Sequence, residues 1–198
     1  MVARDSSPEF LRAPRLGDDG GRTALLVDGV VQSVAVTSFN NRDGYWWEML
    51  PDVRPTRALL LGLGGGTVAQ LLLMRFGLVP MVGVECNEHV LELARSSFLA
   101  AVPMEYRLAD AHEYLAAAEP GFDYVCVDLF HGEEADRRIS GRPFLRHLQR
   151  VVTRGGTICF NLFRDKRTAL SVARISRGLR IIRQIECGKN IIVHAKVS

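Results

Sequence analysis

From residue 57 onward, short apolar runs alternate with longer segments in which apolar residues recur every three or four positions. The first pattern is typical of strands buried on both faces of a sheet, and the second of helices that cover such a sheet. The alternation predicts a mostly parallel sheet with right-handed crossovers. The predicted strands are 58–61, 81–85, 105–109, 124–128 and 157–162, and the predicted helices are 68–76, 88–98, 111–118, 143–152 and 167–177.

Two further strand pairs flank this pattern. Strands at 180–186 and 190–196, separated by Cys187-Gly188, predict an antiparallel hairpin at one edge of the sheet. Strands at 23–27 and 31–36, joined by Asp28-Gly29, predict a short N-terminal β-hairpin. A short helix is expected over 45–50. The predicted organisation is a flexible leader at 1–21, the hairpin and short helix at 22–54, and an α/β domain at 55–198.

The fold expected from these elements is a three-layer, Rossmann-like sheet, and its informative residues follow the strands, because ligands bind beyond the carboxyl ends of such strands. Structural explanations are also open: a tight turn for the glycines, a solvated strand end for Glu85, and a helix cap or structural hydrogen bond for Asp128. Together the candidate residues predict a nucleoside site. The candidates are the glycines Gly62, Gly64 and Gly66 after the first strand, Glu85 after the second, Asp110 after the third and Asp128 after the fourth.

The spacing within the glycine turn favours S-adenosylmethionine over a dinucleotide. A dinucleotide site has G-x-G-x-x-G, and here Thr67 occupies the third glycine position. S-adenosylmethionine has no pyrophosphate and carries a sulfonium cation, so the carboxylates Glu85 and Asp110 suit it. In this interpretation Glu85 accepts from the ribose hydroxyls and Asp110 meets the adenine amino group.

Composition excludes several other classes of protein. The 198 residues carry a net charge of +3 without long basic runs, which gives little support to nucleic-acid binding. No apolar run approaches the roughly 18 residues of a membrane span, and the N-terminus has no apolar signal segment. The four cysteines form no C-x-x-C pair, so we expect buried thiols in a reducing cytoplasm and no metal site.

Five motifs stand out within residues 22–198, namely Leu26–Gln32, Glu48-Met49, Leu59–Gly66, Val84-Glu85 and Ala109–Ala111. Together they resemble the spermidine synthase-like family, and the hairpin motif makes the match more specific than a general methyltransferase pattern. The resemblance implies cofactor binding by Gln32 and Ala111 and a catalytic role for Asp128. Four positions depart from the family pattern: Thr67 and His131 replace aspartates, and Trp46-Trp47 replaces Tyr-Gln.

The expected chemistry is transfer of a group from the sulfonium to a small amine. Asp128 is the candidate for taking the acceptor's proton, with His131 as a proton relay, although a structural bond and a solvated histidine are the alternatives. Either the aromatic side chains form the substrate pocket or they pack the hairpin against the sheet. These side chains are Tyr45, Trp46, Trp47 and Phe130.

Three functions remain open at this level. Methyl transfer is favoured, because Thr67 removes the aspartate that would repel the carboxylate of intact S-adenosylmethionine and leaves a hydroxyl to meet it. Aminopropyl transfer from decarboxylated S-adenosylmethionine is the first alternative, and a cofactor-binding protein without activity is the second. A homodimer is also predicted, because a short hairpin is marginally stable alone and has unpaired edges.

Overall fold

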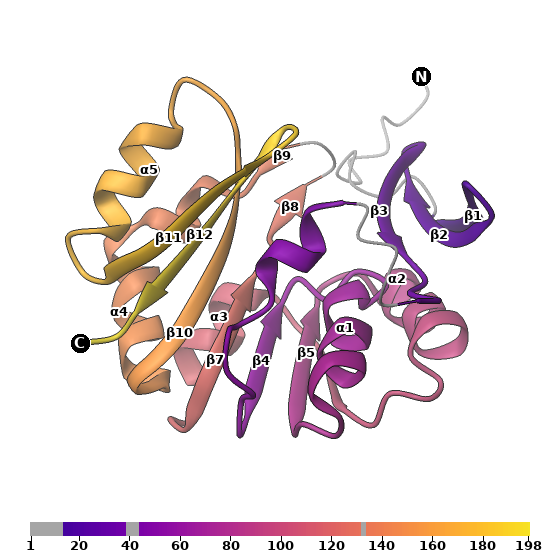
Figure 1. Ribbon diagram of the computed structural model, residues 1–198, viewed down its shortest axis with the longest axis horizontal. Helices are drawn as coiled ribbons and strands as arrows, with labels where there is room; N and C mark the ends of the chain where they lie inside the picture. Colours follow the sequence, from indigo (N-terminus) through magenta and orange to yellow (C-terminus); the bar gives the residue numbers. More distant parts are fainter. Residues whose placement is uncertain (1–13, 39–43, 132–133) are drawn as a thin grey trace, which may run out of the picture.

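The structure, a computed structural model, describes residues 14–38, 44–131 and 134–198. Its centre is a seven-stranded sheet in the order β11-β12-β10-β7-β4-β5-β6 (Figure 1). The five strands from β10 to β6 are parallel, and β12 runs antiparallel between β10 and β11. The strands are β4 (Ala58–Leu61), β5 (Met81–Glu85), β6 (Glu105–Leu108), β7 (Phe122–Val127), β10 (Val152–Phe163), β11 (Arg180–Cys187) and β12 (Asn190–Lys196).

Helices cover both faces of this sheet. On one face lie α1 (Thr67–Phe76) and α2 (Glu88–Leu93), which continues as the π-helical turn η2 (Ala94–Phe98). On the other lie α3 (Ala111–Ala117), α4 (Arg142–Val151) and α5 (Thr168–Ile175). Alternate side chains of each central strand enter the two layers of core, because successive residues of a strand point to opposite faces. The predicted three-layer fold is therefore confirmed.

The N-terminal part forms a separate three-stranded sheet and corrects the prediction of a loose leader. Its strands are β1 (Arg15–Asp19), β2 (Arg22–Val27) and β3 (Val30–Val34). Residues 1–13 of the predicted leader lie outside the described residues, but β1 pairs antiparallel with β2 along its whole length. Gly20 and Gly21 both have positive φ, at 61° and 83°, and make the tight turn that permits this pairing. The polar residues around that turn concealed the hairpin.

The N-terminal sheet packs on the start of α1. Ala24, Leu25 and Val34 are buried in the same core as α1. The side chain of Gln70 accepts a hydrogen bond from the backbone N–H of Val36 at 3.0 Å. The sheet is thus supported within a single chain, which removes part of the reason for expecting a dimer; the dimer itself stays a prediction.

Short elements near the carboxyl ends of the strands were only partly predicted. The expected short helix is the 3-10 turn η1 (Tyr45–Met49). The two-residue strands β8 (Phe130–His131) and β9 (Glu134–Ala135) and the turn η3 (Arg137–Ser140) are too short to leave a periodic signal in the sequence. Within the described ranges, no helix is both long and apolar enough to cross a membrane.

Candidate functional site

A cavity of about 430 Å³ opens at the carboxyl ends of β4, β5 and β7 and at the start of α3. This is the edge of the sheet where the sequence placed the site. Most of the predicted site residues contribute to its lining, namely Gln32, Tyr45, Trp46, Gly62, Gly64, Glu85, Asp110, Ala111, Asp128 and Phe130.

The glycine turn after β4 allows two segments of backbone to come close together. Gly62 has a φ of 81°, and a Cβ built on it would lie 2.1 Å from the carbonyl oxygen of Asp128. A glycine is therefore required where the turn passes the end of β7. Gly66 has a different role from the one expected. It does not line the cavity: as the N-cap of α1 it lies against the side chain of Leu99, where a Cβ would come within 2.5 Å.

Glu85 lies at the end of β5, partly buried at the cavity. Its Oε2 accepts from the N–H of Gly64 at 3.0 Å, and its Oε1 accepts from the N–H groups of Cys86 and Asn87 at 3.0 and 3.1 Å. A carboxylate offers about four lone-pair sites, so these three bonds leave one on Oε2. Glu85 therefore both orders the glycine turn and keeps acceptor capacity for a ligand.

Asp110 caps the N-terminus of α3. Its Oδ1 accepts from the N–H groups of His112 and Glu113 at 2.7 and 3.1 Å. Asp110 is thus a helix N-cap, a structural role that the sequence analysis did not consider for this residue. Both bonds end on the same oxygen, so Oδ2 keeps its lone pairs for a donor in the cavity.

Asp128 follows β7 and is enclosed by two side chains from other elements. Its Oδ2 accepts from the hydroxyl of Tyr45 at 3.1 Å, and its Oδ1 accepts from the side-chain amide of Asn161 on β10 at 2.8 Å. Burial raises the pKa of Asp128 to about 6, although both hydrogen bonds favour the charged form. A carboxyl group with such a pKa can take up a proton near neutral pH.

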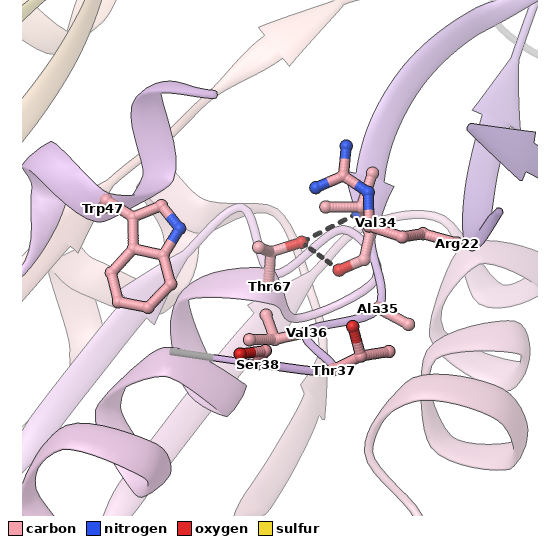
Figure 2. A pocket seen from close by; sticks show the side chains of 8 residues that line it. All are labelled: Arg22, Val34, Ala35, Val36, Thr37, Ser38, Trp47 and Thr67. Atoms are coloured by element: carbon pink, nitrogen blue, oxygen red, sulfur yellow. Dashed lines mark hydrogen bonds between the residues drawn. The ribbon is translucent and has the colours of Figure 1, made fainter. Parts of the chain in front are cut away.

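The aromatic residues do not act as one group. Trp46 is buried and lines the cavity together with Tyr45, and their ring centroids lie 4.7 Å apart. Trp47 was also predicted in the substrate pocket, but it lies against a different, much smaller hollow beside Val36 and Thr67 (Figure 2). Tyr45 and Trp46 thus share the cavity, while Trp47, the next residue of the η1 turn, points to another side. The side chain of His131 lies outside the described part of the chain.

Thr67 corrects the prediction that its hydroxyl could meet a ligand carboxylate. The hydroxyl donates to the carbonyl oxygen of Val34 at 2.9 Å and accepts from the N–H of Val34 at 3.0 Å (Figure 2). Its single proton is already donated, and the side chain is 3% exposed. Thr67 therefore joins α1 to the N-terminal sheet, and its own hydroxyl gives no reason to prefer intact S-adenosylmethionine.

We expect Thr67→Val to lower the free energy of unfolding by about 2–4 kcal/mol, because two buried backbone groups of Val34 lose their partner. Thr67→Ser, which keeps the hydroxyl and removes only a methyl group, is the matched control and should lose clearly less. Urea unfolding of the two variants measures the difference. Equal losses would mean that the hydrogen bonds to Val34 contribute nothing.

The structure also brings polar residues to the site that the sequence analysis passed over. Asp136, 6% exposed, accepts from the side chain of Arg138 and lies 2.9 Å from Nε2 of His112, and all three line the cavity. Hydrogen bonds from Arg138 keep the pKa of Asp136 well below its usual range. His112 lies in the first turn of α3. Asn161 could have been recognised from the sequence as a candidate site residue, since a polar residue buried within an apolar strand requires a hydrogen-bond partner.

Comparison with known proteins places the chain in a family. Residues 58–156, half of the chain, match the family described as methyltransferase domain. The chain is 26% identical over 105 residues to a "probable polyamine aminopropyl transferase" of Bifidobacterium longum, and 28% identical over 120 residues to a polyamine aminopropyltransferase of Vibrio vulnificus. These matches include 53% and 58% of this chain, but only 24% and 40% of the length of the two relatives.

Solved structures share the fold. A "probable spermidine synthase" from Corynebacterium glutamicum superposes with a TM-score of 0.74 over 93% of this chain and 77% of that one, at 18% identity. Human methyltransferase-like protein 13 in complex with SAH gives a TM-score of 0.61 over 73% of this chain and 72% of that one, at 22% identity. At these identities the likeness establishes the architecture, including the N-terminal sheet in the first case, and leaves the reaction open.

Proposed function

The chain belongs to the methyltransferase domain family, and from this premise we propose that it transfers the methyl group of S-adenosylmethionine to a small amine. One observation carries the proposal. A carboxyl group with a pKa of about 6, Asp128, lies at the same cavity as two carboxylates with free acceptor capacity, Glu85 and Asp110. Such a combination suits a reaction in which a neutral amine has to be generated beside a bound cofactor.

The hydrogen-bond acceptors of the cavity suit this cofactor. Oε2 of Glu85 can accept from a ribose hydroxyl, and Oδ2 of Asp110 can accept from the adenine amino group. Gln32 and Ala111 line the same cavity and would complete the contacts. When bound, S-adenosylmethionine supplies an electrophilic methyl group on a cationic sulfur, which carboxylates nearby stabilise.

Asp128 is proposed to act on the acceptor. An ammonium group has no lone pair, so an amine has to give up a proton before or during the transfer. In its charged form Asp128 can hold the ammonium and then take that proton. Tyr45 and Asn161 keep the carboxylate fixed through their two hydrogen bonds. Trp46 and Phe130 offer apolar surface for the body of the acceptor.

Glu85→Ala is expected to weaken binding of S-adenosylhomocysteine at least about tenfold, since a charged acceptor for the ribose is lost. Glu85→Gln, which keeps one oxygen, is expected to fall between the variant and the wild type. Isothermal titration calorimetry measures the affinities. Circular dichroism checks that the variants are still folded, since Glu85 also holds the glycine turn. Wild-type affinity in Glu85→Ala would remove Glu85 from the proposed site.

Aminopropyl transfer from decarboxylated S-adenosylmethionine is the second candidate, and it is supported by the similarity to two proteins named as aminopropyltransferases. Since this chain spans less than half of either relative, their activity does not transfer directly. The Asp-to-Thr departure at Thr67 no longer favours methyl transfer through its hydroxyl. It still leaves the site without the carboxylate that, by resemblance to spermidine synthases, would hold the amine of the decarboxylated cofactor.

One experiment separates the candidates. The protein is incubated with S-adenosylmethionine or its decarboxylated form and a panel of mono- and diamines, and the products are identified by mass. Methyl transfer predicts a gain of one methyl group and S-adenosylhomocysteine as the second product. Aminopropyl transfer predicts methylthioadenosine instead. Binding of either cofactor without any product would favour a protein that has kept the site and lost the reaction.

A further inference from the structure

The η1 turn joins the acceptor side of the cavity to strands far away in the sequence. It packs against α1, β10 and β12, in front of the sheet (Figure 1). Its first residue, Tyr45, reaches Asp128 with its hydroxyl, while its last residue, Met49, is fully buried in the core. The position of Tyr45 on Asp128 therefore depends on what holds the other end of this five-residue turn.

Two buried donors hold that end by its carbonyl groups. The hydroxyl of Tyr124 on β7 donates to the carbonyl oxygen of Met49 at 2.6 Å. The Nε2 of His194 on β12 lies 2.6 Å from the carbonyl oxygen of Glu48. Both side chains are almost completely buried, at 1% and 2% exposure. Buried bonds of this kind are costly to lose, because each carbonyl would remain unsatisfied.

The contact with Glu48 also identifies the protonated nitrogen of His194. A carbonyl oxygen can only accept, so Nε2 has to carry the proton. Burial lowers the pKa of His194, which keeps the ring neutral with that single proton. The guanidinium of Arg183, 3.1 Å from the same nitrogen, cannot then donate to it, and its buried Nε has no partner among the described residues. The Nε2 proton of His194 is thus donated to the carbonyl oxygen of Glu48 in the η1 turn.

We propose that Tyr124 and His194 are positioning residues for the acceptor side of the site: by holding the carbonyl groups of Met49 and Glu48, they keep the hydroxyl of Tyr45 on Asp128. Neither residue touches the carboxylate of Asp128 through a hydrogen bond of its own. Their effect has to pass through η1. The interpretation of Asp128 as a base rests on the proposed function, but the mechanical linkage does not.

Cofactor binding should be independent of this linkage. The hydrogen bonds that orient Glu85 come from the glycine turn and the start of the α2 segment. Those that orient Asp110 come from α3. None of them involves η1. Loosening η1 is therefore expected to affect Asp128 and spare the nucleoside-binding carboxylates.

The titration of Asp128 reports directly on the linkage. The bond from Tyr45 stabilises the charged carboxylate, so its loss raises the pKa of Asp128. The other titratable groups around it are Tyr45 itself, Cys126 and Tyr124 on β7, and Cys159 on β10, and burial raises the pKa of each of them above its usual value. Within this cluster only Asp128 changes charge between about pH 4 and pH 8.

The experiment follows the Asp128 carboxyl carbon by ¹³C NMR over a pH series, in protein without cofactor. Tyr45→Phe is expected to raise the pKa of Asp128 by about 1–2 units, the equivalent of one hydrogen bond to a charged group. Tyr124→Phe, which removes only a hydroxyl that does not touch Asp128, is expected to raise it by at least roughly 0.5 unit. Val125→Ala, on the same strand but in the core of the opposite face, is the control and should leave it unchanged.

His194 provides the second arm. His194→Leu is expected to shift the pKa of Asp128 in the same direction as Tyr124→Phe, and His194→Gln, whose amide can still donate to Glu48, should restore most of the wild-type value. Unmoved titration in both Tyr124→Phe and His194→Leu, or equal shifts in Val125→Ala, would overturn the proposal. Because the readout needs no turnover, absence of any transferase activity would count against the proposed function and leave this test intact.

Discussion

Replacing Asp128 with asparagine is expected to lower turnover by about 10²- to 10⁴-fold, the usual contribution of a positioned general base. Asparagine has nearly the same shape and can keep both neighbours. Its carbonyl oxygen can accept from Asn161, and its amide can donate to the hydroxyl oxygen of Tyr45. The variant therefore removes the proton acceptor while leaving the geometry of the site in place.

The same substitution is expected to stabilise the fold above pH 6. The pKa of Asp128 is raised from 3.8 to about 6, so between these values the folded state binds more protons than the unfolded state. The free energy of unfolding consequently falls as pH rises through that window, by an amount on the order of 2–3 kcal/mol. The substituted asparagine side chain has no charge to bury, so the variant should not show this loss.

Two measurements check the prediction. Initial rates of the wild type should rise with pH through about 6, where Asp128 loses its proton, and thermal unfolding at pH 5 and pH 8 should show that only the wild type becomes less stable. Near-normal turnover in Asp128→Asn would remove Asp128 from the mechanism. A variant that is both inactive and less stable at pH 8 would indicate that the carboxylate supports the structure.

Gly62→Ala is expected to destabilise the protein by about 3 kcal/mol or more and to abolish turnover. Placing any L-residue at a φ of 81° costs about 1–2 kcal/mol. In addition, the new methyl carbon would lie 2.1 Å from the carbonyl oxygen of Asp128, a contact that only movement of backbone can relieve. Because that backbone carries Asp128, relief of the clash displaces the proposed base.

Gly155→Ala is the matched control for this variant. Gly155 has a similar φ of 77°, but no atom lies within 4 Å of the position that a Cβ would take. The difference in the free energy of unfolding between the two variants, measured by urea denaturation, therefore isolates the contact with Asp128. Equal losses would show that the turn and the end of β7 can move apart without cost.

The fold could be predicted from the sequence because its signals are local. Four consecutive buried residues, Ala58–Leu61, run straight into a glycine-rich turn, and the acids Glu85 and Asp110 follow the next two strands. Strand and helix periodicity depends on neighbours a few residues apart, and the site follows because the ends of parallel strands meet at one edge. The boundaries of the central elements accordingly differ from the predictions by only a few residues, except in β10, which begins five residues early.

The site residues whose roles were predicted wrongly or not at all form contacts with residues distant in the sequence. From the sequence, Thr67 is a candidate ligand contact. In the structure its hydroxyl is hydrogen-bonded to the backbone of Val34, 33 residues earlier. Trp46 and Trp47 are indistinguishable by type, and only the orientation of the η1 turn decides which one faces the cavity. The bonds of His112 and Asn161 likewise depend on partners 24 and 33 residues away. No periodic pattern encodes such pairs.

The hydrogen bonds that hold η1 also set an order of events during synthesis. The hydrogen-bond partner of the Met49 carbonyl group, Tyr124, is synthesised 75 residues later. The partner of the Glu48 carbonyl group, His194, is synthesised 146 residues later. Since a nascent chain leaves the ribosome from its N-terminus, the glycine turn and its acids can assemble while η1 still lacks both partners. Contacts of such long separation form slowly, because the intervening loop has to be closed first. The acceptor side is therefore the last part of the site that translation can complete.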